Sequence, residues 1–120
     1  MHILVTGGAG YIGSHVCKAL REASFTPIAY DNLSLGHEWA VKWGPFVNGD
    51  IRDEELLTKT CLQYKPSGVI HLAALSNVRE SAIFPLKYYD NNVGGTLSLL
   101  KVLKSQAIPY FVFSSTCSIY

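Results

Sequence analysis

The stretch TGGAGYIG, residues 6–13, places four glycines within seven positions, directly after the apolar run HILVT at residues 2–6. Glycine inside folded structure costs conformational entropy, so such a cluster needs a geometric reason. The apolar run is short, aliphatic and β-branched, which predicts a buried strand that ends at the glycines. Apolar residues then recur at helical spacing, which predicts a helix with one buried face. That face consists of Ile12, Val16, Ala19, Leu20 and Ala23.

The rest of the pattern predicts four more strands and two more helices. The strands fall at residues 26–30, 46–47, 69–74 and 110–115, and the helices at residues 53–64 and 86–103. Asp53 is the expected N-cap of the second helix. The last helix carries an apolar stripe of Leu86, Tyr89, Val93, Leu97, Leu100 and Leu103 and an adjoining one of Tyr88, Leu99 and Val102. A helix that is apolar on two sides can cover a sheet and also meet a partner.

Strands rich in valine, isoleucine and phenylalanine that alternate with helices are typical of an α/β fold with a doubly wound parallel sheet. We expect the strand order 3-2-1-4-5, with a ligand at the carboxyl ends of the strands near the reversal between strands 1 and 4. The domain is predicted to occupy residues 1–120 and to stop after about the fifth strand. That strand would then be an uncovered apolar edge, which promotes association.

Composition argues against several classes of protein. With 48% hydrophobic and 16% charged residues, the chain is not expected to be disordered. No apolar run approaches the roughly 18 residues of a membrane helix, and we see no secretory leader. A net charge of +1 without a basic cluster argues against nucleic acid as a partner. Cys17, Cys61 and Cys117 lack metal-ligand spacing, so we expect no metal site and interpret them as small apolar residues in a reducing cytoplasm.

Space for a dinucleotide is the geometric reason that the glycines suggest. The first glycine, Gly7 or Gly8, would permit a tight turn. Gly10 would remove the Cβ that holds a pyrophosphate away from the backbone, and Gly13 would let the helix lie close to the strand. Free N–H groups at the helix start would then face the anion. A glycine-rich turn without any ligand is the alternative.

An acid at the end of the second strand supports the same interpretation. The carboxylate of Asp31 can accept hydrogen bonds from the adenosine ribose hydroxyls and would repel a 2′-phosphate, so NAD is favoured over NADP. Asp50 follows the third strand, where it can meet the adenine amino group while Ile51 flanks the ring. A helix cap is the alternative role for Asp50, although Asp53 suits it better. His71, inside an apolar strand, is interpreted as a hydrogen-bonded core residue.

Several stretches spread along the whole chain resemble the extended short-chain dehydrogenase/reductase family. They are VTGGAGYIGSH, YDNLSLGH, GDIRD, VIHLAA, YYDNNVGGT and FSSTCSIY. The glycine motif and HLAA are shared by many members, whereas DNLS, YYDNNV and SSTCSIY are narrower and resemble the members that epimerise sugar nucleotides at C4. The resemblance implies an NAD-binding Rossmann fold, NAD as cofactor, a UDP-sugar as substrate and a homodimer, with the substrate domain beyond these residues.

Carried over position by position, the resemblance implies a set of cofactor contacts. Tyr11 and Ile12 would meet the pyrophosphate through the glycine loop. The other positions would hold the adenosine or line the cleft: Asp31, Asn32 and Ser34 at the ribose, Asp50 and Ile51 at the adenine, Leu72, Ala73 and Ala74 along the cleft, and Asn91 on the long helix. For Asn91, an ordinary polar residue near a helix start is the alternative.

For catalysis, the resemblance points to one residue of this chain. Thr116 would hydrogen-bond the reacting oxygen of the sugar and assist a general base; an ordinary threonine at a strand end is the alternative. Two departures stand out. Ser76 occupies a position where epimerases often have a lysine close to the cofactor, and the sequence contains no Tyr-x-x-x-Lys pair to supply the base.

The implied reaction of a complete enzyme is NAD-dependent epimerisation of a UDP-sugar at C4, which interconverts UDP-glucose and UDP-galactose through a 4-keto sugar. Without the Tyr-x-x-x-Lys pair, residues 1–120 alone are expected to be inactive. The alternatives are a sugar-nucleotide 4,6-dehydratase, a UDP-arabinose-type 4-epimerase and a non-catalytic NAD-binding module. Cys117 and Ser118 stand where dehydratases place an acidic pair, which favours the epimerase over the dehydratase.

Overall fold

The computed structural model describes residues 1–34, 36–73 and 82–114. Within them, one sheet contains parallel strands in the order β3-β2-β1-β4-β5, which confirms the predicted α/β class and strand order. The strands are β1 (His2–Thr6), β2 (Thr26–Asp31), β3 (Phe46–Asn48), β4 (Gly68–His71) and β5 (Tyr110–Phe113). The helical elements are α1 (Tyr11–Glu22), the 3-10 turn η1 (Glu38–Ala40), α2 (Glu54–Tyr64), α4 (Pro85–Tyr89), the π-helical turn η2 (Asp90–Gly94) and α5 (Gly95–Ser105).

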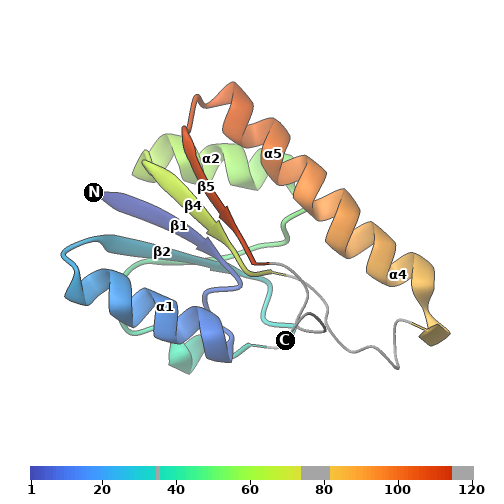
Figure 1. Cartoon of the computed structure of the whole chain (residues 1–120), viewed down its shortest axis with the longest axis horizontal. Helices are drawn as coiled ribbons and strands as arrows, with labels where there is room; N and C mark the ends of the chain where they lie inside the picture. Colours follow the sequence, from blue (N-terminus) through green and yellow to red (C-terminus); the bar gives the residue numbers. More distant parts are fainter. Residues whose placement is uncertain (35, 74–81, 115–120) are drawn as a thin grey trace.

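Helices cover both faces of the sheet: α1 lies on one side, and α2 and α5 lie on the other (Figure 1). Side chains of β1 alternate between the two layers, because Leu4 packs with α2 and α5 while Val5 packs with α1. Both residues are fully buried. The middle of a strand that is buried on both faces is expected to be apolar, which explains Ile3, Leu4 and Val5 at the start of the sequence.

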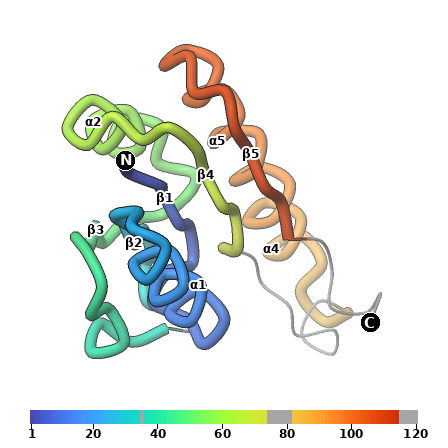
Figure 2. Tube along the Cα trace, turned by 60° about the vertical axis from the view of Figure 1, so that its left-hand side comes forward, coloured from blue at the N-terminus to red at the C-terminus, as the bar shows by residue number. Residues whose placement is uncertain are grey.

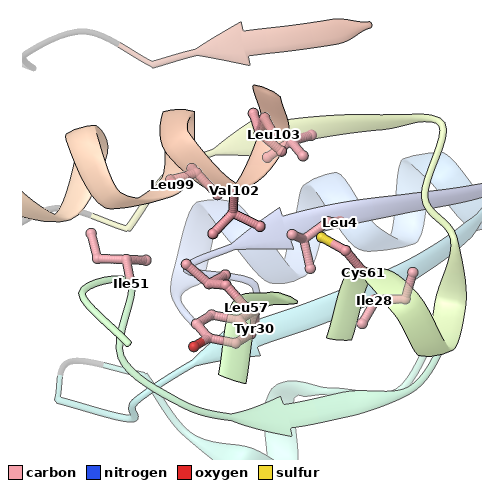
Figure 3. Close-up of a cluster of buried hydrophobic side chains, with 10 residues drawn as sticks. Leu4, Ile28, Tyr30, Ile51, Leu57, Cys61, Leu99, Val102 and Leu103 are labelled. Atoms are coloured by element: carbon pink, nitrogen blue, oxygen red, sulfur yellow. The ribbon is translucent and has the colours of Figure 1, made fainter. Parts of the chain in front are cut away.

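The larger core fills the space between the sheet and the pair α2 and α5. Figure 3 shows Leu57 and Cys61 of α2 and Val102 of α5 gathered around Tyr30 and Leu4 of the sheet. Burial raises the pKa of the Cys61 thiol to about 11, so it stays protonated and packs as a small apolar side chain. The buried Cys17 behaves in the same way in the smaller core under α1, and Cys117 lies outside the described residues.

The predicted position and N-cap of α2 are confirmed. Asp53 caps the helix as predicted, since its carboxylate accepts a hydrogen bond from the Leu56 N–H at 3.0 Å. At the other end, Lys65 adopts the left-handed conformation with φ of 49°, and its N–H bonds to the Cys61 carbonyl. The helix therefore begins and ends within one residue of the predicted range.

Helix α1 buries only part of the predicted face: Val16 and Leu20 are partly buried and pack against the smaller core, as the spacing predicts. Its buried residues are Gly13 and Cys17, whereas Ile12 is 64% exposed and both Ala19 and Ala23 are exposed. Helical spacing alone predicted that Ile12, Ala19 and Ala23 would be buried as well. The close approach of the glycine loop to the helix at Gly13 sets the rotation of α1 instead, so Ile12 turns away from the sheet.

Elements α4, η2 and α5 form one continuous rod along the edge of the molecule that carries β5 (Figures 1 and 2). The adjoining stripe of Tyr88, Leu99 and Val102 faces the interior, together with Leu103. The stripe that the spacing made most prominent is exposed apart from Leu103: Leu86, Tyr89, Val93, Leu97 and Leu100 face outward. The prediction of two apolar sides is confirmed, but the longer stripe is the outer one.

Strand β5 lies at the edge of the described sheet, next to β4 (Figure 2). Tyr110, Val112 and Phe113 are exposed, while Phe111 packs against the larger core. Among the described residues, β5 pairs with β4 alone, so it is an edge strand with exposed apolar side chains, as the sequence predicted.

Candidate cofactor-binding site

The glycine loop joins β1 to α1 and depends on two close approaches. Gly7 has φ of +73°, a conformation that side chains disfavour, and a Cβ there would lie 2.9 Å from the backbone of Leu72 and Ala73. A Cβ on Gly13 would lie 2.0 Å from the Gly7 carbonyl oxygen. Strand, loop and helix therefore pack backbone against backbone, as the predicted roles of these two glycines require.

Gly10 differs from both, because its missing side chain leaves open space. A Cβ built on it would touch only the Gly7 carbonyl oxygen, at an ordinary 3.4 Å, and its φ of −79° suits any residue. The fold itself does not need glycine at this position. The open space above the Gly10 backbone would let a ligand approach this backbone closely.

The amino end of α1 presents free backbone donors beside Gly10. Gly10 is the N-cap and has no side chain to accept from the first-turn N–H groups, which lack partners within the helix. The helix contains no acidic residue in its first turn. These N–H groups and the helix dipole therefore favour an anion at this end, through the backbone of Tyr11 and Ile12 rather than their side chains.

Asp31, at the end of β2, is buried beside this loop. One carboxylate oxygen accepts from the Ala9 N–H at 3.0 Å and the other accepts from the Leu33 N–H at 2.8 Å. Two backbone bonds fix the carboxylate in place and leave further lone pairs available. Since Asp31 also lines the cleft, those lone pairs can accept hydrogen bonds from a ligand hydroxyl.

A cleft of about 100 Å³ opens at the carboxyl ends of β1, β2 and β4. It brings together nine of the residues proposed from the sequence: Gly7, Gly10, Asp31, Asn32, Ser34, Ile51, Leu72, Ala73 and Asn91. Tyr30, Gly36 and Gly49 complete the lining. This is the topological switch point of the sheet, where doubly wound folds bind their ligands.

Four of the proposed residues do not line the cleft. The side chains of Tyr11 and Ile12 are exposed, and Gly13 is buried behind the loop. Asp50 lies beside the cleft but turns its carboxylate toward a neighbouring arginine. Ala74 and Thr116, together with Ser76, lie outside the described residues.

Arg52 is the residue that the sequence analysis missed. Its guanidinium donates to both carboxylate oxygens of Asp50, at 2.9 and 2.7 Å, and also to the carboxylate of Asp90 in η2. The Arg52 side-chain hydrogen bonds hold the pKa of Asp50 below its usual range. The GDIRD stretch contained both partners of the first pair, but the contact with Asp90 joins residues far apart in the chain and had no sequence signal.

Tyr30 stabilises the turn that contains Asp50. Its hydroxyl donates to the Asp50 backbone carbonyl at 2.7 Å, and burial of the ring raises the pKa of the phenol. Ile51, the next residue, packs against Gly95 of α5, where a Cβ would lie 2.3 Å from the Ile51 Cδ1 atom. The end of the cleft that Ile51 lines is therefore attached to both β2 and α5.

His71, at the end of β4, is a buried core residue with hydrogen bonds on both ring nitrogens, as predicted. Nδ1 pairs with the Thr6 hydroxyl, and Nε2 lies 3.1 Å from the Thr96 hydroxyl of α5. The Thr6 oxygen also accepts from the Leu72 and Ala73 N–H groups at 3.0 and 3.2 Å. Burial lowers the pKa of His71 to about 4, so the ring is neutral at physiological pH.

A second hollow of about 530 Å³ lies outside the sheet, between α1 and the segment around η1, and shares Gly10 with the cleft. Its lining is aromatic and basic, without a carboxylate: Ala9, Gly10, Tyr11, Ser14, His15, Lys18, His37, Trp39, Ala40, Lys42 and Trp43. Lys18 lies over the Trp43 ring, 5.9 Å from its centroid. The lysines add positive potential on the outer side of the glycine loop.

The described residues contain neither a metal-binding cluster nor a membrane-spanning helix. No group of three or more histidine, cysteine, aspartate or glutamate side chains there is arranged to hold a metal ion. No described helix is long and apolar enough to cross a membrane.

The doubly wound sheet, the glycine loop and the acid at the end of β2 define a dinucleotide-binding protein of the Rossmann class. The chain belongs to the NAD dependent epimerase/dehydratase family, whose model matches residues 3–120.

The chain is similar to several UDP-glucose 4-epimerases. The UDP-glucose 4-epimerase of Rhizobium meliloti (strain 1021) is 51% identical over 119 residues, and that of Lacticaseibacillus casei is 47% identical over 121 residues. The crystal structure of UDP-glucose 4-epimerase from Brucella ovis in complex with NAD superimposes with a TM-score of 0.95 at 50% identity, covering 99% of this chain. The chain spans 36% of the length of the Rhizobium protein and 37% of the Brucella chain.

Proposed function

We propose that this chain is the NAD-binding part of an enzyme that epimerises a UDP-sugar at C4. The observation that carries the proposal is the cleft at the strand reversal, where the open backbone at Gly10, the amino end of α1 and the fixed carboxylate of Asp31 meet. Support for the substrate comes from the relatives at about half identity, which are UDP-glucose 4-epimerases.

The pyrophosphate and the adenosine half of the cofactor have candidate partners in the chain. The first-turn N–H groups of α1 would hold the pyrophosphate above Gly10. Asp31, with Asn32 and Ser34 nearby, would accept from the adenosine ribose hydroxyls, and Ile51 would flank the adenine. When bound, NAD would supply hydride acceptance and return at C4 of the sugar. The described residues bind and orient, while the role of Thr116 at the reacting oxygen stays a prediction.

The open space at Gly10 allows the site to be tested separately from the fold. Calorimetric titration of the chain with NAD is expected to show one binding site. The Gly10→Ala variant should unfold at the same denaturant concentration as the parent, because the added Cβ meets nothing closer than 3.4 Å. It should bind NAD about tenfold more weakly, a loss of about 1.4 kcal/mol, because the methyl group occupies the space above the loop.

A matched control is Asp53→Asn, which changes a charge on the cap of α2, outside the cleft lining, and should leave NAD affinity unchanged. NADP should bind more weakly than NAD, because its 2′-phosphate would approach the Asp31 carboxylate. No heat from NAD with a folded parent chain, or equal affinity in Gly10→Ala, would contradict the proposed site.

We also propose a homodimer in the cytoplasm. Support for the dimer comes from the exposed apolar stripe on α4, η2 and α5, because monomeric proteins rarely leave a contiguous apolar patch uncovered. Support for the compartment comes from Cys17 and Cys61, which are free thiols in the described part of the chain.

A further inference from the structure

The π-helical turn η2, residues Asp90–Gly94, interrupts an otherwise regular rod and carries one residue of the cleft, Asn91. Single π turns inside helices are uncommon and occur frequently at functional sites. The Asn91 side-chain amide donates to the Asn92 side-chain oxygen at 3.1 Å, so the turn also orients the Asn91 side chain. Whatever holds the turn therefore determines where Asn91 lies.

Thr96 contacts this turn from α5. Its hydroxyl donates to the Asn92 backbone carbonyl at 2.6 Å. The same hydroxyl oxygen lies 3.1 Å from Nε2 of His71, at the end of β4. One side chain thus joins the backbone of the π turn to the strand end beneath the cleft.

Hydrogen bonds link Thr6, His71, Thr96 and the Asn92 carbonyl in a row, and the direction in which each one donates follows from Thr6. The Thr6 oxygen accepts from two backbone N–H groups, of Leu72 and Ala73, so its own proton goes to Nδ1 of His71. The neutral ring then carries its proton on Nε2 and donates it to Thr96. Thr96 has its own proton left for the Asn92 carbonyl, so the hydroxyl protons of Thr6 and Thr96 and the ring proton of His71 each have an acceptor.

We propose that Thr96 is a positioning residue for the cofactor: held by His71, it fixes the π turn so that Asn91 faces the cleft. The proposal rests on the proposed function, because it assigns Thr96 an effect on NAD binding without contact to NAD. It predicts that Thr96 acts through Asn91 and not through the stability of the fold.

A threonine hydroxyl that bonds to a carbonyl one turn earlier is common in helices, so a control must share this bond. Thr60 of α2 provides one. It is 3% exposed, and its hydroxyl donates to the Leu56 carbonyl at 2.8 Å. Thr60 does not line the cleft. Thr60→Val therefore removes the same kind of hydrogen bond without touching the π turn.

The experiment compares NAD dissociation constants of the whole chain by calorimetry. Thr96→Val should weaken NAD binding about fivefold, the effect of one net hydrogen bond. Thr96→Ser, which keeps the hydroxyl, should have the NAD dissociation constant of the parent, and so should Thr60→Val. If Thr96→Val does not fold, Thr96→Ala provides the same comparison, because it leaves room for water in place of the hydroxyl.

A double-mutant cycle with Asn91→Ala separates positioning from general destabilisation. If Thr96 acts through Asn91, Thr96→Val should have no further effect on NAD affinity in the Asn91→Ala background. A full fivefold loss in that background, or an equal loss in Thr60→Val, would overturn the proposal. A parent chain that binds NAD while Thr96→Val binds it equally well would overturn this proposal alone. A folded parent chain that binds no NAD would overturn the proposed function and this proposal with it.

Discussion

Gly10 and Gly13 stand three positions apart in one motif, yet the structure needs them for different reasons. A side chain on Gly13 would enter the Gly7 carbonyl group, whereas a side chain on Gly10 would enter the cleft. The first is a requirement of packing between α1 and the loop. The second follows only from a ligand, so the pair distinguishes the demands of the fold from those of binding.

Gly13→Ala is therefore expected to destabilise the protein even without a ligand. Its Cβ would lie 2.0 Å from a backbone oxygen, and backbone on both sides prevents an easy adjustment. We expect the free energy of unfolding to fall by at least about 2 kcal/mol, in the range of strong overpacking. Urea denaturation measures this loss, with Gly10→Ala as the control that keeps the parent stability. Equal stability of Gly13→Ala and the parent would show that the helix does not depend on this close approach.

At the scale of elements, two long-range contacts attach helices to the ends of strands. Arg52, after β3, reaches Asp90 of η2, and His71 of β4 reaches Thr96 of α5. Both contacts end on the rod that carries Asn91. The Arg52 contacts are partly exposed to solvent and therefore add little stability, but they restrict where the rod lies relative to the cleft.

The buried contact of His71 predicts how stability depends on pH. Burial lowers its pKa to about 4, while an unfolded histidine titrates near 6.5. Between these values the unfolded chain binds the extra proton, so stability falls as the pH falls from about 6.5 to 4. The part due to His71 is up to about 3 kcal/mol, an order-of-magnitude figure for a buried group.

Denaturation at several pH values measures this slope. His71→Gln should flatten the curve between pH 6.5 and 4, which follows from the depressed pKa, although its overall stability will be lower because a buried hydrogen bond changes. His15→Gln replaces an exposed histidine of α1 and is the matched control, with the slope of the parent. A His71→Gln curve parallel to the parent curve would contradict the assigned role of His71.

At the scale of the whole molecule, apolar surface remains uncovered on the rod and on β5. The exposed stripe on the rod runs through all three of its elements, and Leu97 near its middle is 54% exposed. This chain spans 36% of the length of the Rhizobium meliloti relative. The apolar surface of β5 lies at an edge of the sheet, whereas the stripe on α4, η2 and α5 suits a second helical surface.

Leu97→Glu tests the proposed dimer. It places a charge in the middle of the stripe, so light scattering should show a shift from dimer toward monomer. Leu62→Glu is the matched control, because Leu62 of α2 is equally apolar and 59% exposed but does not belong to the stripe. The control should keep the assembly of the parent. A parent chain that is a clean monomer would contradict the proposed dimer directly.

The sequence by itself determined the fold and most of the cleft. Strand positions, the glycine loop and an acid after the second strand are local signals, because each depends on residues within a few positions of one another. The strand order followed from the alternation of strands and helices. For this reason nine of the proposed site residues, from Gly7 to Asn91, meet in one cleft although they come from separate elements.

Only the tertiary structure decided the rotation of the helices and the contacts between distant elements. Spacing made the longer stripe of the rod the more prominent one, yet the shorter stripe, which packs in the same core as Ile51 and Leu57, became the buried one. Ile12 turned outward because the glycine loop lies against the amino end of α1 at Gly13, whereas Val16 and Leu20 further along the helix pack against the smaller core. The contacts of Arg52 with Asp90 and of His71 with Thr96 depend on distances in space, which residues so far apart in the chain do not encode locally.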